Sequence, residues 1–148
     1  MLYAGTAKPI PRNEWKEGAV KLPVESISED DAVIKTPFSK PEVQYIGSTL
    51  GCGCNYPRMQ FLGDGEWEPV RDLEPDAEWD TSERSNIEAL VALLRSTMEE
   101  TVELYGIWVG GGDFFEEPQS REDVSLERFL DTDFRFKEWG FYRVALKG

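Results

Sequence analysis

Hydrophobic residues recur at helical spacing in one long stretch of the chain. Five of them lie three or four positions apart: Ile87, Leu90, Val91, Leu94 and Met98. This spacing places them along one side of a helix, and Asp80 with Glu83 forms a capping-box pattern at its start. The pattern predicts an amphipathic helix over Thr81–Glu100. Its solvent-facing side would carry Glu83, Arg84, Glu88 and Arg95.

Shorter stretches between turn-forming residues favour strands. Two of them carry β-branched and aromatic side chains, Ala32–Lys35 and Glu42–Ile46, and Arg58–Leu62 is a further short candidate. Val102–Val109 is apolar at both alternating sets of positions, as in an inner strand covered on both faces. Phe134–Leu146 predicts a final strand or hairpin, with a bulge or turn where Gly140 interrupts the alternation.

The remaining segments complete the predicted fold. Residues 1–31 are rich in charge and proline, so we expect them to be partly irregular with one short strand. Ser125 can cap the sequence LERFL, which predicts a short second helix over Arg121–Leu130. Strands with helices packed on them define an α+β fold. Residues 1–148 fit a single domain of this class with a mixed or antiparallel sheet.

The composition supports a folded protein outside the membrane. Hydrophobic residues make up 40% of the chain and aromatic residues 12%, which argues against disorder. The N-terminal residues hold no apolar stretch of signal-peptide length, and no stretch approaches the roughly 18 apolar residues of a membrane helix. Two cysteines close in sequence do not make the framework of a secreted disulfide protein. We therefore expect a cytoplasmic protein.

Acidic residues outnumber basic ones. The chain has 29 Asp and Glu against 16 Lys and Arg, which gives a net charge of −13. Phosphate groups attract clusters of Lys and Arg, so we expect no binding to nucleic acid or to a membrane surface. A basic protein would be attracted, and its association accelerated. Solubility alone also explains the charge, and the sequence leaves both interpretations open.

The chain contains no histidine. This removes the Ser-His-Asp and Cys-His nucleophile pairs and most ligand sets for zinc. Catalysis would have to use carboxylates, Lys, Tyr or the two thiols, and among 29 acids no particular pair stands out. We therefore expect no cofactor or metal, and we favour a protein that is not an enzyme.

Both cysteines lie in the segment GSTLGCGCNYPR, where each follows a glycine. A disulfide between Cys52 and Cys54 would close a strained and easily reduced ring, as in a redox switch. Two thiolates also make an incomplete metal site, which suits copper(I) better than zinc. The third interpretation is small thiols in a glycine-rich bend. We favour it, because nothing nearby is arranged to acidify a thiol.

The strand that leads into Gly-Ser-x-x-Gly-Cys-Gly-Cys resembles a segment of a group of small bacterial proteins. The resemblance continues through the helix around Asn86–Leu94 and the strand VELYGIWVG, about two thirds of the chain. It implies no activity, cofactor or site. It marks Gly51–Cys54 as a pattern that either the fold or the chemistry requires.

Acidic residues alternate with other residues before the predicted helix. They occupy even positions: Asp64, Glu66, Glu68, Asp72, Glu74, Asp76, Glu78 and Asp80. In an extended chain this alternation gives one anionic face and one largely apolar face, with Trp67 and Trp79 on the second. Pro69 and Pro75 exclude a central strand and favour a sheet edge or an irregular run. The anionic face would either dock a cationic partner or remain solvated.

The glycines of Gly110–Gly112 follow the predicted inner strand, where a phosphate-binding loop would begin. However, no Gly-Lys-Ser/Thr follows, and Asp113, Glu116 and Glu117 would repel anions. The spacing of these acids does not match an EF-hand calcium loop either. The segment therefore predicts a turn.

Two functions from different classes are compatible with these patterns. The first is a non-enzymatic binding or regulatory module, for example an immunity-like protein that binds a basic protein partner. The alternative is a thiol-redox or soft-metal-handling protein that uses Cys52 and Cys54. We favour the binding module.

Overall fold

The computed structural model describes residues 1–14, 16–17, 21–48, 56–63, 66–69, 81–107 and 117–147. The helices in these residues are the α-helix α1 (Thr81–Ser96) and the 3-10 helices η1 (Glu29–Lys35) and η3 (Leu126–Leu130). The strands are β1 (Leu2–Thr6), β2 (Val24–Ser26), β3 (Glu42–Ile46), β4 (Arg58–Gly63), β5 (Glu66–Pro69), β6 (Thr101–Gly106), β7 (Ser120–Ser125), β8 (Phe136–Lys137) and β9 (Gly140–Ala145).

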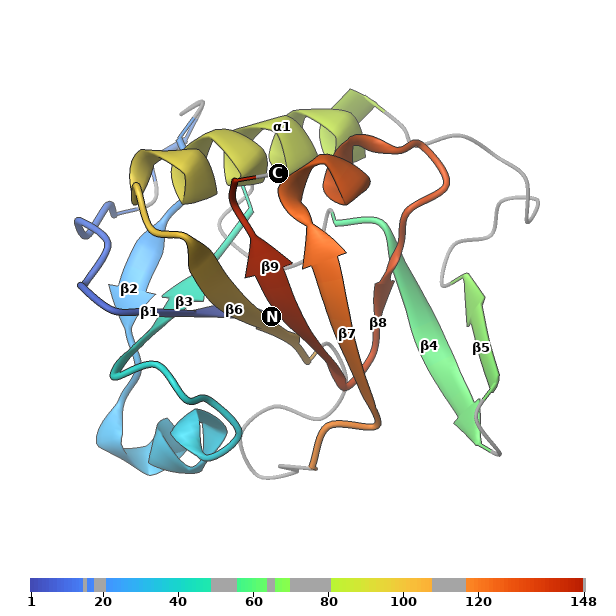
Figure 1. The fold of residues 1–148 in the computed structure, drawn as a ribbon, viewed down its shortest axis with the longest axis horizontal. Coiled ribbons are helices and arrows are strands. Elements are labelled where there is room, and N and C mark those ends of the chain that lie inside the picture. The colour runs from blue at the N-terminus through green and yellow to red at the C-terminus, as the bar shows by residue number, and fades with distance from the viewer. Residues whose placement is uncertain are drawn as a thin grey trace.

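Six strands form a mixed sheet in the order β2-β3-β1-β6-β9-β7 (Figure 1). Its neighbours pair antiparallel except β7 and β9, which run parallel. A second sheet has the order β5-β4-β8, with β4 antiparallel to β5 and parallel to β8. Together with α1, the sheets confirm the predicted α+β class and decide for the mixed arrangement.

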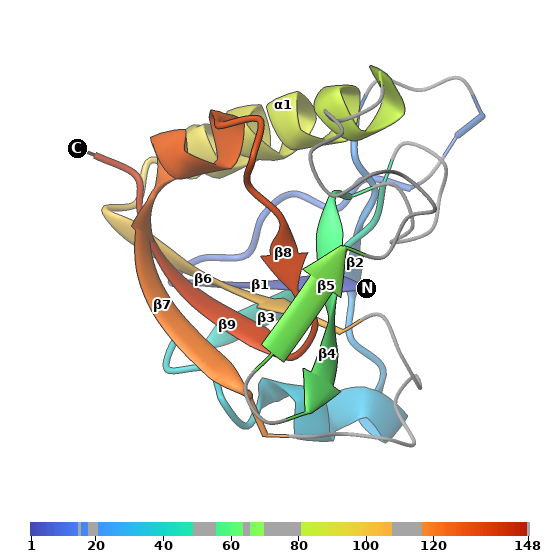
Figure 2. The ribbon, with the colours of Figure 1, turned by 90° about the vertical axis from the view of Figure 1, so that its right-hand side faces the viewer.

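Both faces of the six-stranded sheet are covered. Successive residues of a strand point to opposite faces, so Leu2 of β1 joins Leu90 of α1 in the main core. Its neighbour Tyr3 packs instead with Ile34 of η1 in a second cluster. Figure 2 shows α1 and η3 along one side of the sheet and η1 along the opposite side. The strand predicted within Val102–Val109 is confirmed as β6, an inner strand between these two layers.

The predicted amphipathic helix is confirmed as α1, with two corrections. Its buried residues are Ile87, Leu90, Val91 and Leu94. The helix ends at Ser96, and the prediction that Met98 belongs to the apolar side is wrong, because Met98 has a φ of 57° and is 84% exposed. The prediction for Glu83 is also wrong, because this side chain is buried rather than solvated.

The predicted strand Ala32–Lys35 is wrong, because these residues form the second half of η1. The first turn of η1 holds Glu29, Asp30 and Asp31, and acids at this position stabilise the N-terminus of a helix. Within the stretch only Ile34 is buried. A run of four residues fits either a strand or a helical turn, and the flanking acids favour the turn.

The predicted helix over Arg121–Leu130 is half wrong. Its first half is strand β7, which pairs with β9 along its whole length from Ser120 to Ser125. Pairing with a neighbouring strand overrides the local preference of this charged segment. The sequence LERFL is helical as predicted, in η3, although the side chain of Ser125 makes no capping hydrogen bond.

The N-terminal segment is more regular than predicted. Strand β1 lies in the interior of the sheet, between β3 and β6, and β2 forms one of its edges. Asn13 pairs with Val24 of β2 as an isolated bridge. The segment thus holds two strands, β1 and β2, where the composition predicted one.

The predicted final strand is confirmed as β9, and the predicted turn lies directly before Gly140, but β8 and β9 do not pair with each other as a hairpin. Trp139 has a φ of 58° in the turn between β8 and β9, directly before Gly140. A Cβ atom on Gly140 would lie 2.8 Å from the carbonyl oxygen of Lys137, so the turn has room only for glycine. Because β8 pairs with β4 and β9 with β6 and β7, this turn links the two sheets.

A cluster of aromatic rings fills the core where the sheets meet. Its members are Tyr56, Phe129, Phe134, Phe136 and Tyr142. Phe136 of β8 contacts each of the other rings, with centroid distances of 5.8, 5.4, 4.9 and 5.6 Å to Tyr56, Phe129, Phe134 and Tyr142. Most of these pairs are edge-to-face, which is a preferred geometry of aromatic contacts.

Candidate functional site

Most of the predicted site residues lie outside the described residues. This holds for Cys52 and Cys54, and for the glycines of Gly110–Gly112. Within the acidic run the described part is Glu66–Pro69, which forms β5 at the edge of the smaller sheet, as its proline predicts. The side chain of Glu66 is exposed. The other acids of the run stay predictions: Asp64, Glu68, Asp72, Glu74, Asp76, Glu78 and Asp80.

The residues on either side of the cysteine segment are anchored in the core. Strand β3 leads into Gly47 and Ser48, which are buried, and the chain is described again at Tyr56, where it is buried too. The Tyr56 hydroxyl donates a hydrogen bond of 3.2 Å to the carbonyl oxygen of Gly47. A Cβ on Gly47 would lie 2.6 Å from Pro23, so packing requires this glycine. The described residues at the two ends of the cysteine segment are therefore joined to each other in the core.

Several polar side chains are buried on α1 and in the turn between β8 and β9. Glu83 and Asn86 lie on α1, and Glu138 lies in the turn between β8 and β9. Arg58 of β4 is half-buried, and burial lowers its pKa while the nearby charges of Glu138 and Glu83 raise it. The backbone N–H of Glu138 also donates to the Met59 carbonyl oxygen at 2.8 Å. The sequence does not reveal these buried groups, because helical spacing does not distinguish a buried Glu from a solvated one.

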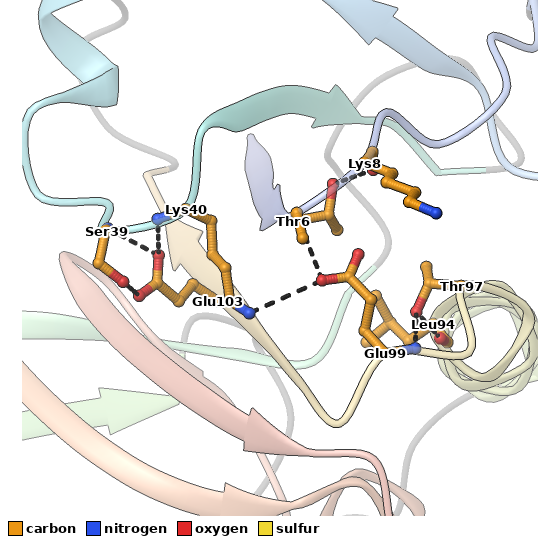
Figure 3. Close-up of polar contacts among 9 residues, drawn as sticks. Thr6, Lys8, Ser39, Lys40, Leu94, Thr97, Glu99 and Glu103 are labelled. Carbon is orange, nitrogen blue, oxygen red and sulfur yellow. Dashed lines mark hydrogen bonds and ion pairs between the residues drawn. The ribbon is translucent and has the colours of Figure 1, made fainter.

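A second polar group centres on Glu103 of β6, which is 4% exposed (Figure 3). Its carboxylate accepts hydrogen bonds from the backbone N–H groups of Ser39 and Lys40, at 2.9 and 3.2 Å, and from the Ser39 hydroxyl. The Lys40 ammonium lies 3.7 Å from Glu99, which also accepts the Ala7 N–H at 2.8 Å. Figure 3 shows Lys40 between the two carboxylates.

The Glu103 group holds the loop before β3 against β6. A serine hydroxyl that donates to a carboxylate resembles a nucleophile paired with a base. Here, however, the same carboxylate is also occupied by two backbone N–H groups of the loop, so its evident role is to satisfy and anchor that loop. A lone Glu inside the apolar strand sequence TVELYG is the signal that could have predicted such a buried acceptor.

The described residues also form a groove between the N-terminal segment and α1, with a volume of about 450 Å³. One wall is built by Ile10–Asn13 and by Lys21, Leu22 and Val24, and the other by Ala89, Ala92, Leu93 and Ser96 of α1. Ile10, Leu22 and Val24 are buried, whereas Arg12 and Lys21 are exposed. The groove therefore combines an apolar floor with two positive charges. No sequence pattern joins its two walls, which lie far apart along the chain.

Comparisons with protein-family models, with curated proteins and with solved structures find no match to this chain. None of the helices in the described residues has the length and apolar character needed to cross a membrane. Within the same part of the chain, acidic side chains are nowhere grouped so that three or more could hold a metal ion.

Proposed function

We propose that the protein is a non-enzymatic binding module that docks a basic protein partner, with an immunity-like role as one form of this function. The observation that carries the proposal is the excess of acids over bases in a chain whose net charge is −13. An acidic surface of this kind attracts basic partners over a distance and accelerates their association.

Many basic side chains in the C-terminal half are already engaged by neighbouring acids. Arg128 lies 3.1 Å from Asp131 and 2.9 Å from Asp133. Further pairs at 3.2 to 3.8 Å are Arg95–Glu127, Lys137–Glu122 and Arg143–Asp123. Each of these basic groups compensates the charge of an acid close to it.

The remaining exposed acids of the described surface are spread over several elements. Those without an ion pair to a described residue include Glu25, Glu29, Asp30, Glu88 and Glu100. Glu29 and Asp30 also stabilise the start of η1. The acids are densest in the sequence between Asp64 and Asp80, which supports this run as the docking face.

Two variants with the same change in net charge test the proposal. The first neutralises the run by E66Q, E68Q, D72N and E74Q, and the matched control neutralises acids elsewhere by E25Q, E29Q, D30N and E88Q. Each variant and the natural protein serve as bait in a pull-down from cell lysate at low and high salt. A basic protein that is retained is then purified, and its association rate with each bait is measured as salt is raised.

We expect the run variant to lose most of the partner and to associate more slowly, while the control binds as the natural protein does. Salt should slow association, because exposed charges are screened. An equal loss in both variants would show that net charge acts without a docking face. Equal recovery of the same proteins by all three baits would assign the acidic run to solubility and overturn the proposal.

A further inference from the structure

We propose that the groove between the N-terminal segment and α1 is a binding site for a small monocarboxylate with an apolar body, such as a medium-chain aliphatic acid. This proposal does not rest on the proposed function. The assignment is supported by its size, its preformed wall, its apolar floor and two positive charges that have no partner among the described residues.

The size and lining of the groove suit a small ligand. Its volume of about 450 Å³ falls within the range of about 300–1,000 Å³ that is typical of small-molecule sites. The lining is mostly aliphatic: Ile10, Leu22, Val24, Ala89, Ala92 and Leu93. The small side chains of Ala89 and Ala92 leave space beside α1. An aliphatic chain in this space would remove both its own surface and that of the floor from water.

The wall opposite α1 is held in place by hydrogen bonds. Asn13 and Val24 exchange backbone hydrogen bonds of 3.1 and 2.9 Å, and the Asn13 side chain donates to the Leu22 carbonyl oxygen at 2.8 Å. The buried Gln44 amide accepts the Ile10 N–H at 2.8 Å and donates to the Ile10 carbonyl oxygen at 2.9 Å. A ligand therefore does not have to order this wall, which lowers the cost of binding.

The charges at the groove select an anion. Arg12 and Lys21 line it, and neither side chain makes an ion pair or hydrogen bond within the described part of the chain. Lys40, Arg95, Arg128, Lys137 and Arg143, by contrast, contact acids. None of the described residues that line the groove is acidic. A guanidinium can hold a carboxylate through two parallel hydrogen bonds, so Arg12 suits the ligand head group.

A neighbouring hollow shows why the groove is the better site. It has a volume of about 380 Å³ and is also lined by Arg12, together with Lys35. Glu42 lines it as well and would oppose the entry of an anion. Polar atoms contribute most of its accessible lining, whereas the groove beside α1 is mostly apolar. An amphipathic carboxylate therefore fits the groove.

The test measures binding of decanoate by calorimetry, with decyltrimethylammonium as the cationic probe of equal chain length. The charge variant is R12Q with K21Q, and its matched control is K8Q with K147Q, which removes two exposed basic groups outside the groove. The filling variant is A92F, and its matched control is S85F at another exposed position of α1. Circular dichroism and thermal unfolding establish that each variant is folded.

We expect saturable binding of decanoate and no binding of the cationic probe. The charge variant should bind about tenfold more weakly, because charge-assisted hydrogen bonds to the head group are lost. Filling the groove should abolish binding, whereas both controls should bind as the natural protein does. Absence of decanoate binding, equal binding of both probes, or an equal effect of variants and controls would overturn the assignment. Recovery of a basic partner in the pull-down is independent of all these results.

Discussion

Glu103 on the inner strand β6 and Ser39 in the loop before β3 form a doubly hydrogen-bonded pair, although 63 residues lie between them. One carboxylate oxygen accepts the Ser39 backbone N–H at 2.9 Å and the other accepts the Ser39 hydroxyl. The acid is buried and the serine is exposed. The contact therefore satisfies a buried charge with donors brought from the surface.

The two members of this pair should differ in their effect on stability. E103A leaves the backbone N–H groups of Ser39 and Lys40 without their acceptor, and we expect it to lower the free energy of unfolding by about 3 kcal/mol. S39A removes one hydroxyl donor at the surface and should cost about 1 kcal/mol. Urea unfolding measures both, with the exposed neighbour variant E100Q as the control. Equal losses of unfolding free energy in E103A and S39A would contradict the role of Glu103 as the acceptor that holds this loop.

Phe136 should be the most sensitive position of the aromatic cluster. It is fully buried and contacts four other rings, so F136A should lower the free energy of unfolding by about 3–5 kcal/mol. The matched control is L130A, because Leu130 is 41% exposed and its truncation should cost less than about 1 kcal/mol. Thermal or urea unfolding measures the free energy of unfolding of both variants. A small cost for F136A would mean that the two sheets do not share this core.

The elements that the sequence predicts well are those whose own side chains determine them. Helical spacing identifies α1 because its apolar residues repeat over several turns, and β6 is apolar on both alternating sets. Strand β7 is different, because its charged residues adopt an extended backbone only through pairing with β9. Its correct assignment required knowledge of a partner strand that follows later in the chain.

The candidate sites separate in the same way. The cysteines and the acidic run are visible as local patterns, whereas the groove joins residues near position 12 to residues near position 92. The residue spacing in one of these two segments does not indicate that it contacts the other. Arg12 and Lys21 also look ordinary in a segment that contains several charges. Only their position beside the apolar side chains of α1 gives them a role.

Stability should fall steeply above pH 10. Burial is the main cause that raises the pKa of Tyr3 to about 12, and it also raises the pKa values of Tyr45, Tyr56 and Tyr142. An unfolded tyrosine ionises near pH 10, so above this pH the unfolded state binds fewer protons than the folded state. The stabilisation is complete below pH 10 and is lost as the pH rises through the folded pKa.

Each tyrosine that remains protonated should reduce the free energy of unfolding by about 1.4 kcal/mol per pH unit in this range. Urea unfolding at several pH values measures the slope, and phenolate absorbance near 295 nm reports ionisation. In Y56F the free energy of unfolding should fall less steeply with pH, because the contribution of one tyrosine is removed. The lost hydrogen bond to Gly47 should cost about 1 kcal/mol at neutral pH. Phenolate absorbance that rises near pH 10 without unfolding would contradict the burial of these side chains.

The last prediction concerns Cys52 and Cys54 and tests the alternative function, in which these two thiols carry redox or metal chemistry. Gly47, Ser48 and Tyr56 at the two ends of their segment are buried, and the hydrogen bond between Tyr56 and Gly47 involves neither sulfur atom. We expect C52A with C54A to lower the free energy of unfolding by less than about 2 kcal/mol and to leave partner recovery unchanged.

The rate of alkylation of the two cysteines, measured against pH, gives the thiol pKa, and thiol counts with and without reductant reveal a disulfide. A structural role predicts a pKa at or above the usual value of about 8.5 and no reversible disulfide at cytosolic potential. A thiol pKa below about 7, or a disulfide that forms reversibly at that potential, would replace the binding module by a redox function.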